Sequence, residues 1–226
     1  MRLLGDVDKA AHAQKFFKTG KGQYGEGDRF LGIRVPETRK MAKKCRDLTL
    51  KQTTRLLQSP VHEERLLALF VLVWQFPRKG EEHQQAIFDL YLDNTRFINN
   101  WDLVDSSAHF IVGPWLQNRS RKPLNKLALS QSLWERRIAI ISTYHYIRQK
   151  DFSDALAISR KLLTDEHDLI HKAVGWMLRE IGNRNLAAEE IFLRRHYRKM
   201  PRTMLRYAIE KFPEDLRLSY LKGTLS

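Results

Sequence analysis

The sequence has a single cysteine and no long apolar run, and each shortage excludes a class of protein. With Cys45 alone among 226 residues, neither an internal disulfide nor a metal cage of thiolates can form. No uncharged apolar stretch reaches the roughly 18 residues of a membrane span, and acidic Asp6 appears before a signal-peptide core could develop. We therefore expect a cytoplasmic protein without a membrane anchor.

Signatures of several enzyme classes are missing as well. The glycine-rich stretch 19–28 lacks the Gly-x-x-x-x-Gly-Lys-Ser/Thr order of a nucleotide P-loop, and no Gly-x-Ser-x-Gly elbow is present. His167 and His171 have the i, i+4 spacing of a zinc helix, but no third ligand is evident. We expect no metal and no cofactor. The glycine loop keeps two interpretations, a flexible connection or a contact of Lys21 and backbone amides with a phosphate backbone.

Positive charge is in clear excess. Lys and Arg number 40 against 26 Asp and Glu, a formal net charge of +14 with a pI near 10.0. Eight basic residues oppose Glu135 alone between 119 and 150, whereas six acidic residues oppose Arg96 alone between 81 and 105. Such a charge attracts polyanions at long range. Nucleic acid is the leading partner class, and a basic surface with no specific partner is the alternative.

Apolar residues recur at helical rather than alternating spacing over most of the chain, which predicts an all-α protein. A hydrophobic content of 42% fits one domain over residues 1–226. A glycine loop and a short extended stretch at 30–36 follow the first helix. The expected helices span 8–18, 36–45, 49–58, 62–76, 81–93, 99–116, 123–130, 134–148, 152–163, 168–182, 186–197, 201–211 and 214–222.

Small residues repeat at the spacing of helical-pair repeats. They stand 31 to 40 residues apart, at Ala68, Ala108, Ala139, Gly175 and Ala208. Stacked helix pairs of this kind form an α-solenoid, a curved array whose concave basic groove could hold a duplex. An irregular helical bundle is the alternative.

The start of the expected helix 99–116 carries the leading candidate site. On a helical wheel the face that should meet the core gathers Leu103, Val104, Ser107, Phe110 and Ile111. Trp101 and Asp105 lie one turn apart on the opposite edge, beside Asp102 and His109. An aromatic ring and a carboxylate that point together away from the core indicate function. The structural alternative is a Trp half covering a neighbouring helix and an Asp favoured by the helix dipole.

Two later helices carry comparable features. Arg137 falls within an isoleucine-rich stripe, where a guanidinium needs an anionic partner such as Asp105 or a phosphate. Trp176 lies away from the core face of its helix, on the side shared with Lys172 and Arg179, an arrangement suited to nucleic acid. The structural alternatives are an Arg with a packed stem and a solvated head, and a Trp packed on the next repeat.

Four separated motifs occur in order along nearly the whole chain. They are Phe16-Phe17-Lys18-Thr19-Gly20-Lys21-Gly22 through Phe30-Leu31-Gly32-Ile33-Arg34-Val35-Pro36, then Asn100-Trp101-Asp102-Leu103-Val104-Asp105, Trp134-Glu135-Arg136-Arg137, and Lys172-Ala173-Val174-Gly175-Trp176-Met177-Leu178-Arg179-Glu180. Any one alone is weak evidence, but together they resemble the AlkD-like DNA alkylation repair enzymes.

This resemblance implies a monomer of HEAT-like helical repeats that acts as a DNA glycosylase on N3- and N7-alkylated purines in duplex DNA, without metal or cofactor. The residues that match the family's catalytic and lesion-contacting side chains are Asp105, Trp101, Arg137 and Trp176. Arg136 is the alternative to Arg137, and the expected DNA contacts are Lys21, Arg136, Lys172 and Arg179. The resemblance also implies that the protein cradles the DNA backbone and sugar at the lesion, while the damaged base can remain stacked in the duplex. The preferred substrate, N3-methyladenine or N7-methylguanine, stays open at this point. So does the question of whether the damaged base is flipped out of the duplex or stays stacked.

Two other function classes remain open from the sequence. A non-catalytic HEAT-type module could bind DNA or branched nucleic acid through the same basic surface, and a protein-interaction scaffold would bind DNA weakly. Asp105 distinguishes the glycosylase from the DNA-binding module, because a carboxylate facing phosphates weakens binding and is useful only for chemistry.

Overall fold

The computed structural model describes residues 2–225, and every regular element among them is a helix. The extended backbone in this part of the chain forms one isolated parallel bridge, between Arg29 and Val61. No helix among the described residues is long and apolar enough to cross a membrane. The all-α prediction is confirmed.

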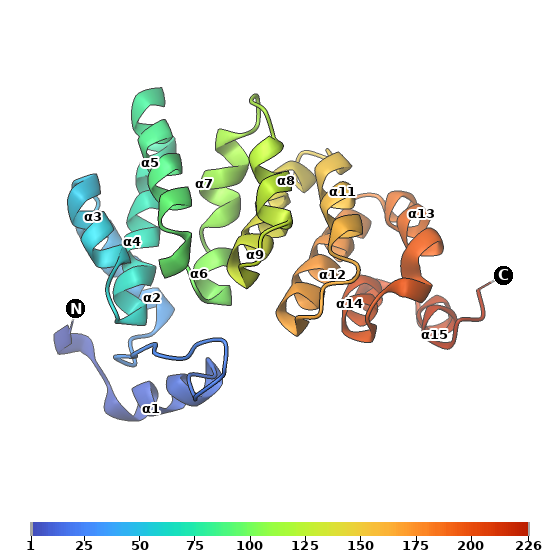
Figure 1. Cartoon of the computed structure of the whole chain (residues 1–226), viewed down its shortest axis with the longest axis horizontal. Coiled ribbons are helices and arrows are strands. Elements are labelled where there is room, and N and C mark those ends of the chain that lie inside the picture. Colours follow the sequence, from blue (N-terminus) through green and yellow to red (C-terminus); the bar gives the residue numbers. More distant parts are fainter. Residues whose placement is uncertain (1, 226) are drawn as a thin grey trace. The chain divides into compact units, whose positions relative to one another are not determined.

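The chain divides into two compact units, Met1–Trp115 and Leu116–Ser226. Short 3-10 helices at Arg2–Leu4, Phe76–Arg78 and Thr95–Phe97 supplement the α-helices of the first unit (Figure 1). Those α-helices are α1 (Val7–Phe16), α2 (Val35–Lys44), α3 (Leu50–Leu57), α4 (His62–Gln75), α5 (Glu81–Asp93), α6 (Trp101–Asp105) and α7 (Ala108–Trp115).

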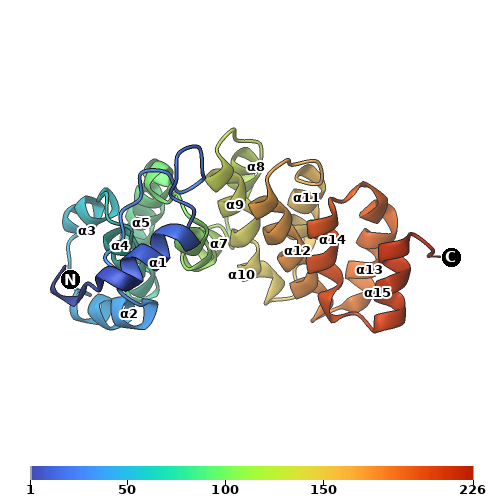
Figure 2. The ribbon, with the colours of Figure 1, turned by 90° about the horizontal axis from the view of Figure 1, so that it is seen from below.

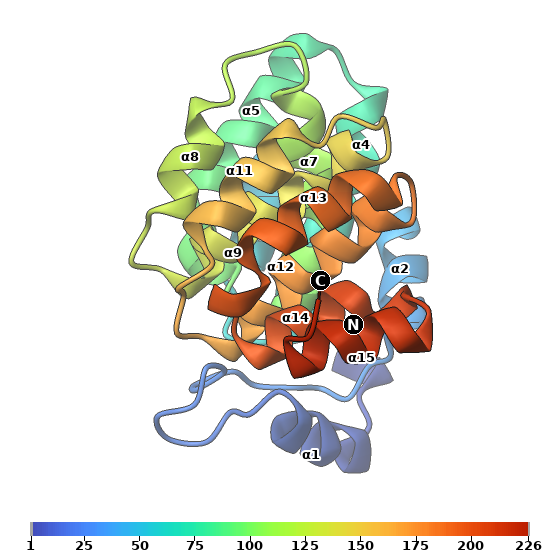
Figure 3. The ribbon, with the colours of Figure 1, turned by 90° about the vertical axis from the view of Figure 1, so that its right-hand side faces the viewer.

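The second unit repeats helix pairs in two rows. Helix α12 packs against α9 and α14 in one row, and α8, α11 and α13 pack onto α9 and α12 from the other (Figures 2 and 3). Its helices are α8 (Lys122–Ala128), α9 (Leu133–Ser142), α10 (Tyr144–Ile147), α11 (Ser153–Lys161), α12 (Asp168–Gly182), α13 (Leu186–His196), α14 (Arg202–Ala208) and α15 (Glu214–Lys222), with 3-10 turns at Tyr197–Lys199 and Ile209–Lys211.

The repeated small residues explain how these helices approach one another. One lies on each of α4, α7, α9, α12 and α14, and all five are buried. A Cβ on Gly175 of α12 would collide with the Met204 carbonyl and the Tyr207 side chain on α14. Glycine at 175 therefore permits the close packing of α12 on α14. The prediction of tandem helical repeats is confirmed.

Two expected helices are each divided in the structure. The predicted helix 99–116 breaks at Ser106 and Ser107, which separate α6 from α7, and the predicted helix 134–148 breaks at Thr143 between α9 and α10. Ser106 Oγ donates to the Asp102 carbonyl at 2.6 Å, and Thr143 Oγ1 donates to the Ile140 carbonyl at 2.6 Å. Hydroxyls that bond to backbone carbonyls one turn back compete with the helix ladder and bend the chain.

The break corrects one member of the predicted core face. Leu103, Val104, Ser107 and Ile111 are fully buried, as expected, whereas Phe110 is 40% exposed. The wheel treats residues 99–116 as one unbroken helix, and the turn at Ser106 and Ser107 changes the direction in which Phe110 points. Phe110 instead lies with its ring 3.9 Å from that of His109, on the outside.

Candidate functional site

Trp101 and Asp105 are the first and last residues of α6, one turn apart and both half-buried. The fully buried Asn100 caps this short helix, because its Oδ1 accepts the Trp101 backbone N–H at 2.9 Å. Close by, Tyr91 Oη and Ser107 Oγ lie 2.9 Å apart. Burial and then the charge of Asp105 raise the pKa of Tyr91, so this phenol stays neutral. Helix spacing alone places Trp101 and Asp105 on one side.

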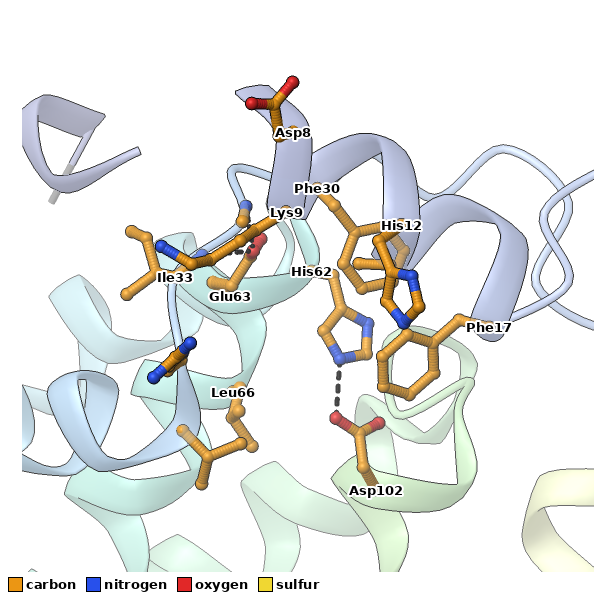
Figure 4. Close-up of a pocket in the computed structure, with 14 residues that line it drawn as sticks. Asp8, Lys9, His12, Phe17, Phe30, Ile33, His62, Glu63, Leu66 and Asp102 are labelled. Atoms are coloured by element: carbon orange, nitrogen blue, oxygen red, sulfur yellow. Dashed lines mark hydrogen bonds and ion pairs between the residues drawn. The ribbon is translucent and has the colours of Figure 1, made fainter. Parts of the chain in front are cut away.

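A buried ionic network holds the start of α6 against the start of α4. His62 Nε2 lies 2.8 Å from Asp102 Oδ2, and His62 Nδ1 lies 3.3 Å from Asp28 Oδ2. Arg65 donates from Nη2 to Asp28 Oδ1 at 2.7 Å. Asp28, His62 and Arg65 are each under 10% exposed. Figure 4 shows the ring of His62 facing the carboxylate of Asp102.

The charge state of this network follows from its contacts. Burial alone lowers the pKa of His62, but the charge and hydrogen bond of Asp102 and the hydrogen bond of Asp28 raise it to about 9. Burial raises the pKa of Asp28, yet the bonds and charges of His62 and Arg65 lower it overall. At neutral pH His62 is therefore an imidazolium that donates to both carboxylates. The network, which we call the His62 network, consists of Asp28, His62, Arg65 and Asp102.

Aromatic rings connect this network to Trp101. The Phe17 ring stacks on Trp101 with centroids 5.3 Å apart and lies 5.1 Å from the His62 ring. Phe30 stacks on Phe17 at 5.0 Å and on His62 at 4.5 Å, and Phe16 meets Trp101 edge-on at 5.9 Å. The end of α1 therefore covers part of the Trp101 ring and fixes its orientation.

Glu63 anchors the extended stretch that follows the glycine loop. Its carboxylate accepts the backbone N–H groups of Leu31 at 3.0 Å, Gly32 at 2.8 Å and Ile33 at 3.2 Å. Gly32 has a φ of +78°, and a Cβ there would collide with the Asp6 carbonyl. Glycine at 32 and a buried carboxylate at 63 thus hold this segment beside α1 and α4.

A cavity of about 450 Å³ lies under α1, beside this network. Its lining includes Phe17, Phe30, His62 and Asp102, and Figure 4 shows these side chains around it. Trp101 and Asp105 do not line this cavity. Helix α6 therefore contributes Asp102 to the wall of the cavity, while Trp101 and Asp105 on the same helix lie outside it.

Within the second unit, both arginines of the 136/137 pair are engaged. Arg137 is 5% exposed and donates to the carbonyl of Leu169 at the start of α12. Arg136 is half-buried and donates from Nε to Asp165 Oδ2 at 2.6 Å. The expectation that Arg137 lies inside the isoleucine stripe agrees with its burial, and a backbone carbonyl provides one of its contacts.

Trp176 is half-buried on α12, away from the core face. Its Nε1 donates to Glu180 Oε1 at 3.2 Å, and its ring lies 6.0 Å from that of Tyr144. The two cations expected beside it are ion-paired, Lys172 with Asp168 at 2.7 Å and Arg179 with Glu210. Any contact of these cations with an anion would compete with an existing carboxylate.

The glycine loop satisfies its own amides. Gly20 N donates to Gln23 Oε1 at 2.9 Å, and Gly22 N donates to Glu26 Oε2 at 2.7 Å. Lys21 is exposed between them. A contact between this loop and phosphate remains a prediction for the Lys21 side chain, while the Gly20 and Gly22 amides already have side-chain acceptors.

His167 and His171 serve the start of α12. His167 Nδ1 accepts the Leu169 backbone N–H at 3.1 Å, and His171 Nε2 bonds to the Asp165 carbonyl. Residues 2–225 hold no cluster of three or more side chains suited to bind a metal ion. His167 therefore caps the start of α12.

The four predicted catalytic residues fall in different units. Trp101 and Asp105 belong to the first unit, and Arg137 and Trp176 belong to the second. Sequence reasoning missed Asp28 and His62, which lie in no recognisable motif. The available signal was the polar pair His62-Glu63 at the start of α4, a helix that is buried over most of its length, because buried polar residues require partners.

Comparisons with known proteins agree with this architecture. The family described as "DNA alkylation repair enzyme" matches residues 1–212. A solved structure described as a predicted DNA alkylation repair enzyme from Enterococcus faecalis is 18% identical, covers 93% of this chain and 97% of its own, and gives a TM-score of 0.70. AlkD2 from Streptococcus mutans is 16% identical, with coverage of 92% and 99% and a TM-score of 0.58. Comparison with curated proteins gives no match.

Proposed function

We propose, from the premise that the chain belongs to the DNA alkylation repair enzyme family, that it is a monofunctional DNA glycosylase. Its substrates are the cationic purines produced by alkylation at N3 or N7 in duplex DNA. It works as a monomer without metal or cofactor, in the cytoplasm and on the nucleoid, in base excision repair.

The observation that supports this proposal best is the pairing of Trp101 with Asp105 on α6. Both side chains are half-buried, and the helix that carries them is fixed by the Asn100 cap and by the His62 network. A carboxylate on a rigid helix beside an aromatic ring is suited to meet a cationic sugar and base. Arg137 and Trp176 are the proposed contributions of the second unit.

The proposed reaction needs an ionised carboxylate rather than a general acid that protonates the leaving base. An alkylated purine already carries positive charge and leaves readily, so a strong general acid is unnecessary. As the glycosidic bond breaks, positive charge develops on the sugar, and Asp105 stabilises it and orients the attacking water. Two unit charges about 4 Å apart interact by roughly 4 kcal/mol at an effective dielectric of 20, or about a thousandfold in rate.

The test is base release from methylated duplex DNA with a chelator present. Asp105→Asn keeps the shape and removes the charge, so release should fall at least about a hundredfold while undamaged duplex binds as before or slightly tighter. Asp93→Asn, an exposed carboxylate at the end of α5, is the matched control and should keep the parental rate. Near-parental excision by Asp105→Asn would exclude the proposed role. An inactive parent protein that still binds DNA would point to the non-catalytic module.

A further inference from the structure

A second cavity, of about 410 Å³, lies at the end of α13 in the second unit and is surrounded by cations. Its lining consists of Arg194, Arg195, Tyr197, Arg198, Lys199 and Leu225. All four cations are exposed, whereas Tyr197 is buried and forms an aromatic floor. Between Glu190 and Glu210 the sequence holds six Lys and Arg and no acidic residue.

The surrounding groups leave this charge largely uncompensated. Arg194 has a carboxylate partner, Glu190, at 3.8 Å, and Arg198 donates from Nε to the Tyr197 hydroxyl at 3.1 Å. Arg195 and Lys199 form no ion pair with residues 2–225. Cations in the last turn of a helix are stabilised by the helix dipole, and this explains Arg194 and Arg195 at the end of α13. Arg198 and Lys199 follow the end of α13 and are not explained in this way.

A neighbouring histidine responds to the field of these cations. Burial lowers the pKa of His196, and the charges of Arg160, Lys199 and Arg195 lower it further. A concentration of positive charge around a hollow is the arrangement that attracts and seats an anion. The family context and the net charge of +14 favour a polyanion over a small metabolite.

We propose that this cavity binds a phosphate of the DNA backbone, as a contact site separate from the α9 and α12 side chains assigned to catalysis. Arg195 and Lys199 provide the charge and Tyr197 the floor. The site lies on α13, in the other row of helices from α9 and α12. This inference rests on the proposed function in one respect, the choice of DNA as the ligand. The cavity has to bind DNA, but it takes no part in base excision.

The first test compares two charge-matched double variants of the full chain. Arg195→Gln with Lys199→Gln should reduce the slope of log K against log salt for undamaged duplex by about 0.9 per lost phosphate contact. Lys43→Gln with Lys44→Gln, two exposed cations at the end of α2, removes equal charge and should leave the slope unchanged. Equal slopes for the parent and the Arg195/Lys199 variant would overturn the proposal.

The second test follows the His196 ring by NMR titration with inorganic pyrophosphate and with a short duplex. An anion in the cavity neutralises the field of Lys199 and Arg195, so both ligands should raise the pKa of His196. A rise with pyrophosphate but not with duplex would overturn the assignment to DNA, and no rise with either would overturn the site. Both tests measure binding to undamaged duplex or pyrophosphate and need no excision, so their outcomes stay interpretable even if the protein proves not to be a glycosylase.

Discussion

The two units differ in where they place their charges. The first holds 18 Lys and Arg against 14 Asp and Glu, and the second 22 against 12. In the first unit Asp28, His62 and Arg65 are buried and paired with one another. In the second unit most ion pairs are partly exposed, and one carboxyl, Glu189, is buried with an oxygen that lacks a hydrogen-bond partner.

This difference indicates two uses of charge. A buried network of ion pairs costs desolvation but fixes the relative positions of the loop at Asp28, of α4 and of α6, where the proposed catalytic carboxylate lies. Exposed cations fix little, because each surface pair contributes only about 0–1 kcal/mol, but together they produce the field that attracts DNA. In the first unit, charged groups therefore mainly fix the positions of side chains. In the second unit, they mainly attract DNA over a distance.

The largest expected effect comes from breaking the His62 network. Asp28→Asn leaves Arg65 and the imidazolium of His62 buried without their shared anion, so the first unit should lose about 3–5 kcal/mol of stability. Native-state hydrogen exchange at the buried amides of α4 measures this loss, and α12 amides provide the internal reference. Glu37→Gln, an exposed carboxylate on α2, should change exchange by less than about 0.5 kcal/mol. A loss below about 1 kcal/mol for Asp28→Asn would show that the network is not needed for stability.

Parts of this arrangement could be predicted from sequence because they are local. The i, i+4 spacing placed Trp101 and Asp105 on one side, and the same rule pairs Lys172 with Asp168. The His62 network could not be predicted, since Asp28 and Asp102 lie 34 and 40 residues from His62 and meet it only in the folded chain. The helix ends near Ser107 and Thr143 could have been predicted from the adjacent hydroxyl residues at each position. The helical spacing of apolar residues continues across both positions and favoured one long helix instead.

The next largest effect is the pH dependence of the first unit. The folded pKa of His62, about 9, lies above its ordinary value of 6.5, so protonation favours the folded state. Its contribution is complete below pH 6.5 and disappears as the pH rises through 9, a loss of about 3 kcal/mol in α4 exchange. His62→Gln should be less stable at pH 6.5 and show a flatter profile above it. Equal profiles for parent and variant would mean that His62 is neutral in the fold.

The last comparison concerns Glu189, whose side chain packs over Gly182 and is 1% exposed. Burial raises its pKa to about 9, with the charge of Glu190 adding to the shift, so the folded state favours the protonated form. The second unit should therefore lose stability as the pH rises from 4.5 to 9, and between pH 5 and 6.5 it should change while the first unit does not.

Glu189→Gln separates this explanation from a general pH effect. The neutral amide has nearly the same shape and no proton to lose, so the variant should exceed the parent by on the order of 2 kcal/mol at pH 8 in α12 exchange. The gain stays below the full cost of ionisation because the amide N–H groups also need partners in a buried site. At pH 5, where the parent carboxyl is protonated, the two proteins should be nearly equal. A variant less stable than the parent at pH 8 would mean that Glu189 is ionised and stabilised in the fold, and the contrast with Asp28 would then be lost.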